Sequence, residues 1–125
     1  MSILRQASGT RAQRSGLAAE AAACATLEQD GWTILARRLQ TGAGEIDIVA
    51  ERSGLLAIIE VKSRATLSDA AYALSARQRR RLIAATEALL AVHPDWGAAG
   101  VRFDVIVVDK QYNIRRIRDA FRQES

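Results

Sequence analysis

The chain has 125 residues, of which 49% are hydrophobic, 26% are charged and 5% are aromatic, and it contains one proline. This length suits a single domain, and the apolar content excludes a disordered or proline-rich protein. The formal net charge is +4 and all basic residues except Lys62 and Lys110 are arginines, which fits a nucleic-acid partner and equally fits a genome rich in G and C.

The segment 1–14 carries three arginines but lacks the apolar stretch and the cleavage site of a secretory signal. We expect a flexible basic N-terminal tail over 1–14 and a single domain over 15–125, with an arginine-rich targeting segment as the alternative for the tail. The longest apolar stretches, such as residues 55–59, are far shorter than the roughly 20 residues that cross a bilayer. We therefore expect a cytoplasmic protein that does not enter a membrane.

An alanine-rich helix is predicted after the tail, because apolar residues recur there at helical spacing. These residues are Leu17, Ala21, Cys24 and Leu27. The Asp-Gly pair at residues 30–31 ends the pattern. Cys24 is the only cysteine, so the chain has no internal disulfide, and we interpret it as a small core residue.

Three strands are predicted next, over residues 32–39, 44–51 and 55–63, from their β-branched and apolar residues. A glycine-containing bend at residues 41–44 separates the first two strands. Residues 53–54, Ser-Gly, have the composition of a two-residue hairpin loop. The second and third strands are therefore expected to pair antiparallel.

The second half of the chain is predicted to contain one long helix and two strands. A short helical turn is expected over 69–74, and Ser75 with Gln78 has the spacing of a capping box that opens a helix to about Val92. The strands follow over residues 101–109 and 112–121. The order α-β-β-β-α-β-β predicts a three-layer α/β domain in which helices flank a mixed sheet of about five strands.

Two acidic residues are expected to face each other across the predicted hairpin. A two-residue loop at 53–54 places Arg52 opposite Leu55, and the same register places Asp47 opposite Glu60. Opposed residues of antiparallel strands have Cβ atoms about 4.5–5.5 Å apart. Carboxylates this close repel each other unless a proton or a cation lies between them, and Mg²⁺ accepts such oxygen ligands.

Lys62 lies two residues beyond Glu60 and projects from the same face, where its ammonium is able to position a water or stabilise charge on a phosphate. A cross-strand salt bridge on a solvated face is the alternative interpretation. The functional one is favoured because Glu20 lies on the apolar stripe of the first helix, where a lone carboxylate is costly unless it reaches the same cation or solvent at the edge of the stripe. It is also favoured because Glu60 and Lys62 close an otherwise apolar strand that is expected to be buried.

The motifs GEIDIVA (44–50), IIEVKSR (58–64) and RFDVI (102–106), after an alanine-rich helix, resemble those of the YraN-like family of uncharacterised bacterial proteins. The resemblance spans nearly the whole chain. That family is similar to the PD-(D/E)xK nuclease superfamily, near the archaeal Holliday-junction resolvases and the restriction endonucleases, so the resemblance implies a restriction-endonuclease-like fold. It implies Glu20, Asp47, Glu60 and Lys62 as catalytic residues. It also implies that Asp47, Glu60 and Glu20 are ligands of Mg²⁺ or Mn²⁺.

Three departures from the family pattern are visible. Ala19 precedes Glu20 where the family usually has glycine, and Arg77 opens the second helix where it usually has lysine. Arginine at that position retains contact with phosphate but cannot serve as a titratable amine. The segment 65–70 lacks the Gly-Pro pair that often follows the third strand, so a different loop shape over the site is expected.

Four arginines near these residues are candidates for contact with a phosphate backbone. They are Arg64, Arg77, Arg80 and Arg81. A solvated helix face is the alternative interpretation for the three that lie on the second helix.

The resemblance implies a Mg-dependent endonuclease that hydrolyses phosphodiester bonds in DNA, with structured or branched DNA in repair or recombination as the expected substrate. Resolvase-like enzymes act as dimers, so a homodimer is also expected. Two alternatives stay open. One is a non-catalytic nucleic-acid-binding accessory protein that keeps the nuclease fold, and the other is a structural or partner-binding protein whose acidic cluster is an ion-pair network.

Overall fold

The computed structural model describes residues 11–68 and 72–122. Its elements are α2 (Arg11–Gln29), β1 (Thr33–Thr41), β2 (Gly44–Arg52), β3 (Leu55–Ser63), α3 (Ala76–Val92), β4 (Gly100–Val108) and β5 (Ile114–Phe121). This order agrees with the predicted one. No helix in these two ranges is long and apolar enough to span a bilayer.

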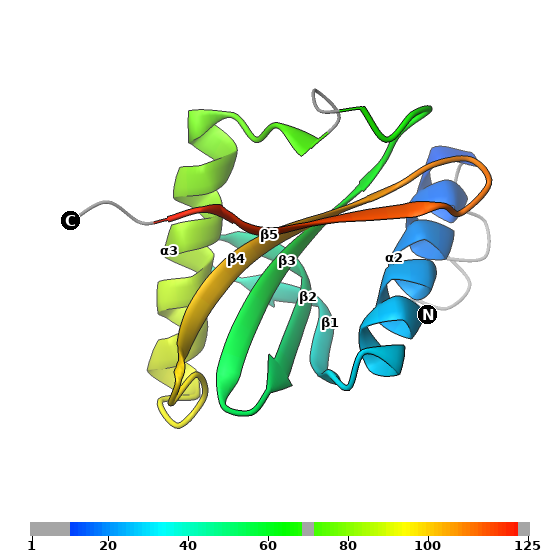
Figure 1. The fold of residues 1–125 in the computed structure, drawn as a ribbon. Helices are drawn as coiled ribbons and strands as arrows, with labels where there is room; N and C mark the ends of the chain where they lie inside the picture. The colour runs from blue at the N-terminus through cyan, green and yellow to red at the C-terminus, as the bar shows by residue number, and fades with distance from the viewer. Residues whose placement is uncertain (1–10, 69–71, 123–125) are drawn as a thin grey trace, which may run out of the picture.

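The strands form one mixed sheet in the order β1-β2-β3-β4-β5. All neighbours are antiparallel except β3 and β4, which are parallel. A parallel pair needs a crossover connection, and α3 lies in it. Figure 1 shows α2 and α3 on opposite faces of the sheet, which gives the predicted three-layer α/β arrangement.

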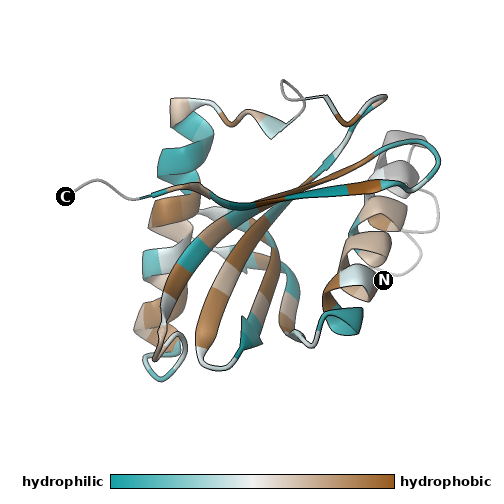
Figure 2. Ribbon diagram, viewed as in Figure 1, coloured by the Kyte–Doolittle hydropathy of each residue, from teal (hydrophilic) through white to brown (hydrophobic). Residues whose placement is uncertain are grey.

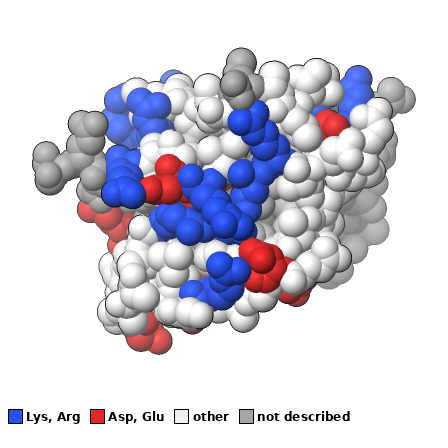
Figure 3. Space-filling view, viewed as in Figure 1, with Lys and Arg blue, Asp and Glu red and all other residues white. Residues whose placement is uncertain are grey.

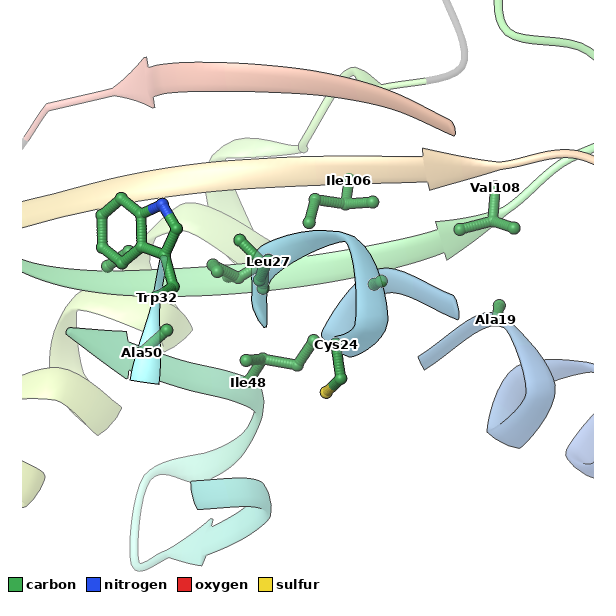
Figure 4. Close-up of a cluster of buried hydrophobic side chains, with 11 residues drawn as sticks. Ala19, Cys24, Leu27, Trp32, Ile48, Ala50, Ile106 and Val108 are labelled. Atoms are coloured by element: carbon green, nitrogen blue, oxygen red, sulfur yellow. The ribbon is translucent and has the colours of Figure 1, made fainter. Parts of the chain in front are cut away.

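Each face of the sheet has its own hydrophobic core, and the central strands are the most apolar part of the fold (Figure 2). The core under α2 appears in Figure 4 and consists of Ala19, Ala23, Cys24, Leu27, Trp32, Ile48, Ala50, Ala57, Ile59, Ile106 and Val108. The core under α3 consists of Ile46, Val49, Leu56, Ile58, Leu82, Ala85, Leu89 and Phe103. β2, β3 and β4 therefore bury side chains on both faces.

Helix α2 differs from its predicted form at both its start and its buried face. It begins at Arg11, so the last four residues of the predicted 1–14 tail are helical, while residues 1–10 lie outside the described residues. Ala21 is exposed, and the residues that pack on the sheet are Ala19, Ala23, Cys24 and Leu27. The apolar stripe is therefore rotated from the predicted one, because several alanines satisfy the same spacing.

The β2–β3 hairpin has the predicted two-residue loop. Ser53 and Gly54 have φ angles of 52° and 81°, and two successive positive φ values are those of a type I′ turn. Arg52 pairs with Leu55, as predicted, and the same register continues to Ile48 and Ile59. The turn chemistry thus determines which residues of the two strands meet.

Helix α3 carries the predicted capping box. The Gln78 N–H donates to Oγ of Ser75, and the Ser75 N–H donates to the Gln78 side chain. His93 ends the helix as its C-cap and stacks on Trp96 at 3.9 Å between ring centroids. The short helical turn predicted over 69–74 lies partly outside the described residues.

Candidate functional site

The β2–β3 ladder stops one residue before Asp47 and Glu60, which are next in register after the Ile48–Ile59 pair. At that point Oδ2 of Asp47 accepts a hydrogen bond of 2.8 Å from the Val61 N–H. Backbone N–H groups of a strand point sideways within the sheet. The Asp47 carboxylate therefore lies beside β3, at the point where the β2–β3 ladder ends.

The alternation of side chains along β2 changes at Asp47. Ile46 packs under α3 with Val49, whereas Ile48 packs under α2. On β1, Arg38 lies opposite Asp47 in the pairing register and has a φ of 50°, which is uncommon for a residue other than glycine. Strict alternation would place Ile46 and Ile48 on one face of the sheet, and this interruption places them on opposite faces.

Glu60 is mostly buried beside Asp47, with 13% of its side chain exposed. Desolvation, the Asp47 charge and a hydrogen bond with the Asp47 side chain raise the pKa of Glu60 to about 7, while Arg81 and Lys62 partly oppose the rise. A hydrogen bond between two carboxyl groups requires a shared proton. The pair can therefore hold a proton near neutral pH and exchange it for a cation.

Glu20 approaches the same carboxylate from α2. Its Oε1 atom is buried and has no hydrogen-bond partner among the residues that the structure describes. Desolvation and the Asp47 charge raise its pKa to about 7, Glu45 adds to the rise, and Arg38 and Arg37 oppose it. Glu20 is thus electrostatically coupled to Asp47, as predicted from its place on the helix.

Lys62 is buried, with 7% of the residue exposed. Desolvation and Arg64 lower the pKa of its amine, and Glu60 and Asp47 oppose the shift. The structure therefore places a buried amine among the acidic residues, where the sequence predicts it.

Arg81 of α3 extends over the start of β2 to the site. Its Nη2 lies 3.7 Å from Oε2 of Glu60. A Cβ atom on Gly44 would lie only 2.9 Å from both Cγ and Cδ of Arg81. Gly44, the first residue of the GEIDIVA motif, therefore leaves the space through which Arg81 reaches Glu60.

The other arginines predicted to contact phosphate lie apart from this contact. Arg64 follows β3, is exposed and donates to the carbonyl of Ser63. Arg77 and Arg80 are exposed on α3. Of the four predicted arginines, the structure pairs only Arg81 with an acidic residue of the site.

Arg37, Arg38 and Glu45 also belong to this site and were not predicted from the sequence. All three act on the pKa of Glu20. Arg37 and Arg38 lie on β1, and Glu45 lies on β2, which pairs with it. The one signal in the sequence was the unusual Arg-Arg pair within a strand, which strict alternation would have placed on opposite faces.

The donor set suits a hard divalent cation. Asp47 and Glu60 supply adjacent carboxylates, and the unpartnered Oε1 of Glu20 supplies a third acceptor that needs a positive group. Within residues 11–68 and 72–122, no three His, Cys, Asp or Glu side chains form a ready-made group of metal ligands. A cation at this site would therefore rely chiefly on Asp47 and Glu60, and Glu20 could add an outer or additional ligand.

Comparison with known proteins extends across this site. The model of the uncharacterised protein family UPF0102 matches residues 19–108. A UPF0102 protein from Granulibacter bethesdensis is 64% identical over 114 residues, covering 91% of this chain and 72% of that protein. Similar proteins from Rhodopseudomonas palustris and Azorhizobium caulinodans are 47% identical over 108 residues and 48% identical over 113 residues, covering 86% and 90% of this chain and 83% and 86% of their own lengths.

Proposed function

The chain belongs to the uncharacterised protein family UPF0102, and we propose that it is a metal-dependent nuclease of the PD-(D/E)xK superfamily that hydrolyses phosphodiester bonds in DNA. The observation that supports this most directly is the acidic pair at the end of the β2–β3 ladder. Asp47 and Glu60 adjoin there, Lys62 is buried two residues further along β3, and Glu20 brings a third carboxylate from α2. This combination is costly to bury unless a cation or a proton neutralises it.

Asp47 and Glu60 would hold Mg²⁺ or Mn²⁺, with Glu20 as a further ligand. When bound, such an ion polarises a phosphoryl oxygen and lowers the pKa of a coordinated water. The hydrogen bond from the Val61 N–H to Oδ2 of Asp47 fixes the orientation of that carboxylate before any ligand arrives.

The other residues of the site have roles that follow from their surroundings. The Lys62 amine has a lowered pKa and is able to donate hydrogen bonds to the attacking water or to a phosphoryl oxygen. The Glu20 carboxyl has a pKa of about 7, so it is able to release its proton near neutral pH when a cation binds. Arg81 holds Glu60 from the α3 side and partly neutralises it.

Exposed arginines around the site would bind the phosphate backbone. Arg64, Arg77 and Arg80 are accessible to a large ligand, and arginine binds phosphate through two parallel hydrogen bonds. Similarity to the resolvases of this superfamily favours structured or branched DNA, a role in repair or recombination, action as a homodimer and a cytoplasmic location. These assignments rest on analogy with the superfamily.

A second candidate is a non-catalytic accessory protein that binds nucleic acid and keeps the nuclease fold. It is favoured by the hydrogen bond between the Asp47 and Glu60 side chains, which a shared proton makes possible without a cation. In that case protons, held by Glu20 and Glu60 near neutral pH, would neutralise the acidic cluster without a metal.

Calorimetric titration with Mg²⁺ and Mn²⁺ tests the proposal, using the wild type, Asp47→Asn and the control Asp95→Asn, which makes the same change at an exposed residue outside the site. The same proteins are assayed on a labelled four-way junction, a duplex and a single strand. Metal binding and cleavage that are lost only in Asp47→Asn support the nuclease. Metal binding without cleavage of any substrate favours the accessory protein, and no metal binding in the wild type overturns the metal site.

A further inference from the structure

Three hydrogen-bond donors and a fourth, more distant guanidinium converge on one oxygen atom, Oδ2 of Asp30. Arg52 Nη1 lies 3.0 Å from it, Arg116 Nη1 and Trp32 Nε1 lie 3.3 Å from it, and Arg118 Nη2 lies 3.8 Å from it. Asp30 and Trp32 lie in the turn between α2 and β1, Arg52 ends β2, and Arg116 and Arg118 lie on β5. Residues far apart in the sequence therefore build one site for a negatively charged oxygen.

The site has more positive charge than its own carboxylates neutralise. Arg102 and Arg116 also pair with the buried Asp104, at 2.8 Å and 3.2 Å. Four guanidinium groups thus share two carboxylates, counting Asp30. Figure 3 shows the result as a concentration of basic side chains on the face of the molecule that carries β5.

The guanidinium groups are held in place before any ligand binds. Three of them lie over the Trp32 ring, with Arg52 at 4.8 Å, Arg116 at 5.0 Å and Arg102 at 5.6 Å from its centroid. Arg102 also makes two parallel hydrogen bonds to Asp104. Side chains ordered in this way lose little conformational entropy when they bind an anion.

Asp30 is well placed to be displaced by an external anion. Its side chain is 45% exposed, and it lies between the end of α2 and Gly31, whose φ of 83° marks the turn. Partial desolvation raises the pKa of Asp30, but the surrounding arginines and the indole N–H outweigh it and hold the pKa below its usual value. The site therefore favours an ionised oxygen, which a phosphate also offers.

We propose that Arg52, Arg116, Arg118 and the Trp32 N–H form a binding site for a backbone phosphate of nucleic acid, which the Asp30 carboxylate occupies in the free protein. The choice of nucleic acid as the partner rests on the proposed function. Arg52 ends β2, five residues from Asp47, so the site is about 17 Å along the strand from the acidic pair. This site would bind a backbone phosphate roughly five base pairs from the phosphate that reacts at the acidic pair.

The test compares two aspartates that pair with arginines near β5. Asp30→Asn removes the competing charge at the site, and Asp119→Asn makes the same charge change beside Arg122, outside the site. Binding of labelled duplex DNA is measured by fluorescence anisotropy over a series of salt concentrations, with EDTA present throughout. Asp30→Asn is expected to bind about fivefold to tenfold more tightly than Asp119→Asn at about 0.1 M salt, because one more phosphate contact becomes available.

A second pair of variants tests the arginines directly. Arg118→Gln removes a guanidinium that is 60% exposed, and Arg122→Gln removes one that is 82% exposed on the same edge of the sheet. Arg118→Gln is expected to weaken binding and to lower the salt slope by about 1 relative to Arg122→Gln. This pair decides the question if Asp30→Asn fails to fold.

Equal binding by Asp30→Asn and Asp119→Asn, or by Arg118→Gln and Arg122→Gln, would overturn the proposal. So would wild-type protein that binds inorganic phosphate but no DNA. EDTA prevents metal binding and cleavage during these measurements. The DNA-binding results therefore stay the same even if Asp47 and Glu60 bind no metal. Conversely, substitutions at the Asp30 site are expected to leave unchanged the calorimetric titration with metal that compares wild type and Asp47→Asn.

Discussion

The guanidinium of Arg81 lies 3.7 Å from the carboxylate of Glu60, and the side chain that carries it passes directly over Gly44. A helix on one face of the sheet is thereby connected to an acidic residue of the central strand. The contact depends on the absence of a side chain at residue 44.

Gly44→Ala is expected to destabilise the protein by about 1–3 kcal/mol, because alanine is strained at the φ of 143° found there and its Cβ would displace Arg81. Urea unfolding measures this change. Gly42→Ala is the matched control, since a Cβ at Gly42 meets nothing within 4 Å. Equal stability of the two variants would contradict the packing of Arg81 against Gly44.

The stability of the protein is expected to fall as the pH rises from about 4.5 to about 7. Glu20 and Glu60 have pKa values of about 7 in the folded protein against 4.5 for an ordinary glutamate. In that window the folded state holds more protons than the unfolded state, so raising the pH favours unfolding. Urea unfolding at about pH 5 and about pH 8 measures the effect, and the double variant Glu20→Gln/Glu60→Gln is expected to lose most of it.

Metal binding is expected to release protons near neutral pH. Glu20 and Glu60 are partly protonated there, and a divalent cation binds the ionised carboxylates. Calorimetric titration with Mn²⁺ in two buffers of different ionisation enthalpy counts the protons released. Binding with no dependence on the buffer would show that these carboxyl groups are not the ligands.

Lys62→Met is expected to preserve metal binding and to lower the cleavage rate about a hundredfold or more, because the amine acts on the water or the phosphate. Methionine fits the buried position, where 7% of the residue is exposed. Lys110→Met removes the other lysine at an exposed position and is the control. Loss of metal binding in Lys62→Met would instead assign the lysine a role in shaping the carboxylate pair.

Asp104→Asn is expected to destabilise the protein by about 3 kcal/mol, since it leaves the partly buried guanidinium groups of Arg102 and Arg116 with an uncharged partner. Asp104 is 1% exposed, pairs with Arg102 and Arg116, and accepts the Asp119 N–H at 2.9 Å. Thermal unfolding measures the loss. The exposed Asp95 provides a control substitution to asparagine, and similar losses in both variants would contradict a structural role specific to Asp104.

Much of the site was predictable because local chemistry determines the register of one hairpin. Ser53 and Gly54 form a two-residue turn, and counting back from it leads to Asp47 and Glu60. The capping box at Ser75 similarly predicted the start of α3. In each case the types of a few residues close together in the sequence determine the local structure.

The remaining features depend on contacts that no local pattern contains. The interruption of alternation at Asp47 involves the unusual φ of Arg38 on the neighbouring strand. The buried stripe of α2 was ambiguous because Ala19, Ala21 and Ala23 all have small apolar side chains. The convergence of donors on Asp30 joins residues as far apart along the chain as Asp30 and Arg118.

The single parallel pair in the sheet also has a consequence for the order of folding. Every strand contact up to Ser63 belongs to a sequential antiparallel hairpin, whereas β4 reaches β3 only after the chain has passed through α3. Local pairs close with a smaller entropy cost than distant ones. The β2–β3 hairpin that carries Asp47, Glu60 and Lys62 can therefore form early, whereas β4 pairs with Glu60 through Val105 only when the distant pair closes. Glu60, whose pKa is raised chiefly by burial, therefore reaches its final surroundings only after β4 has paired with β3.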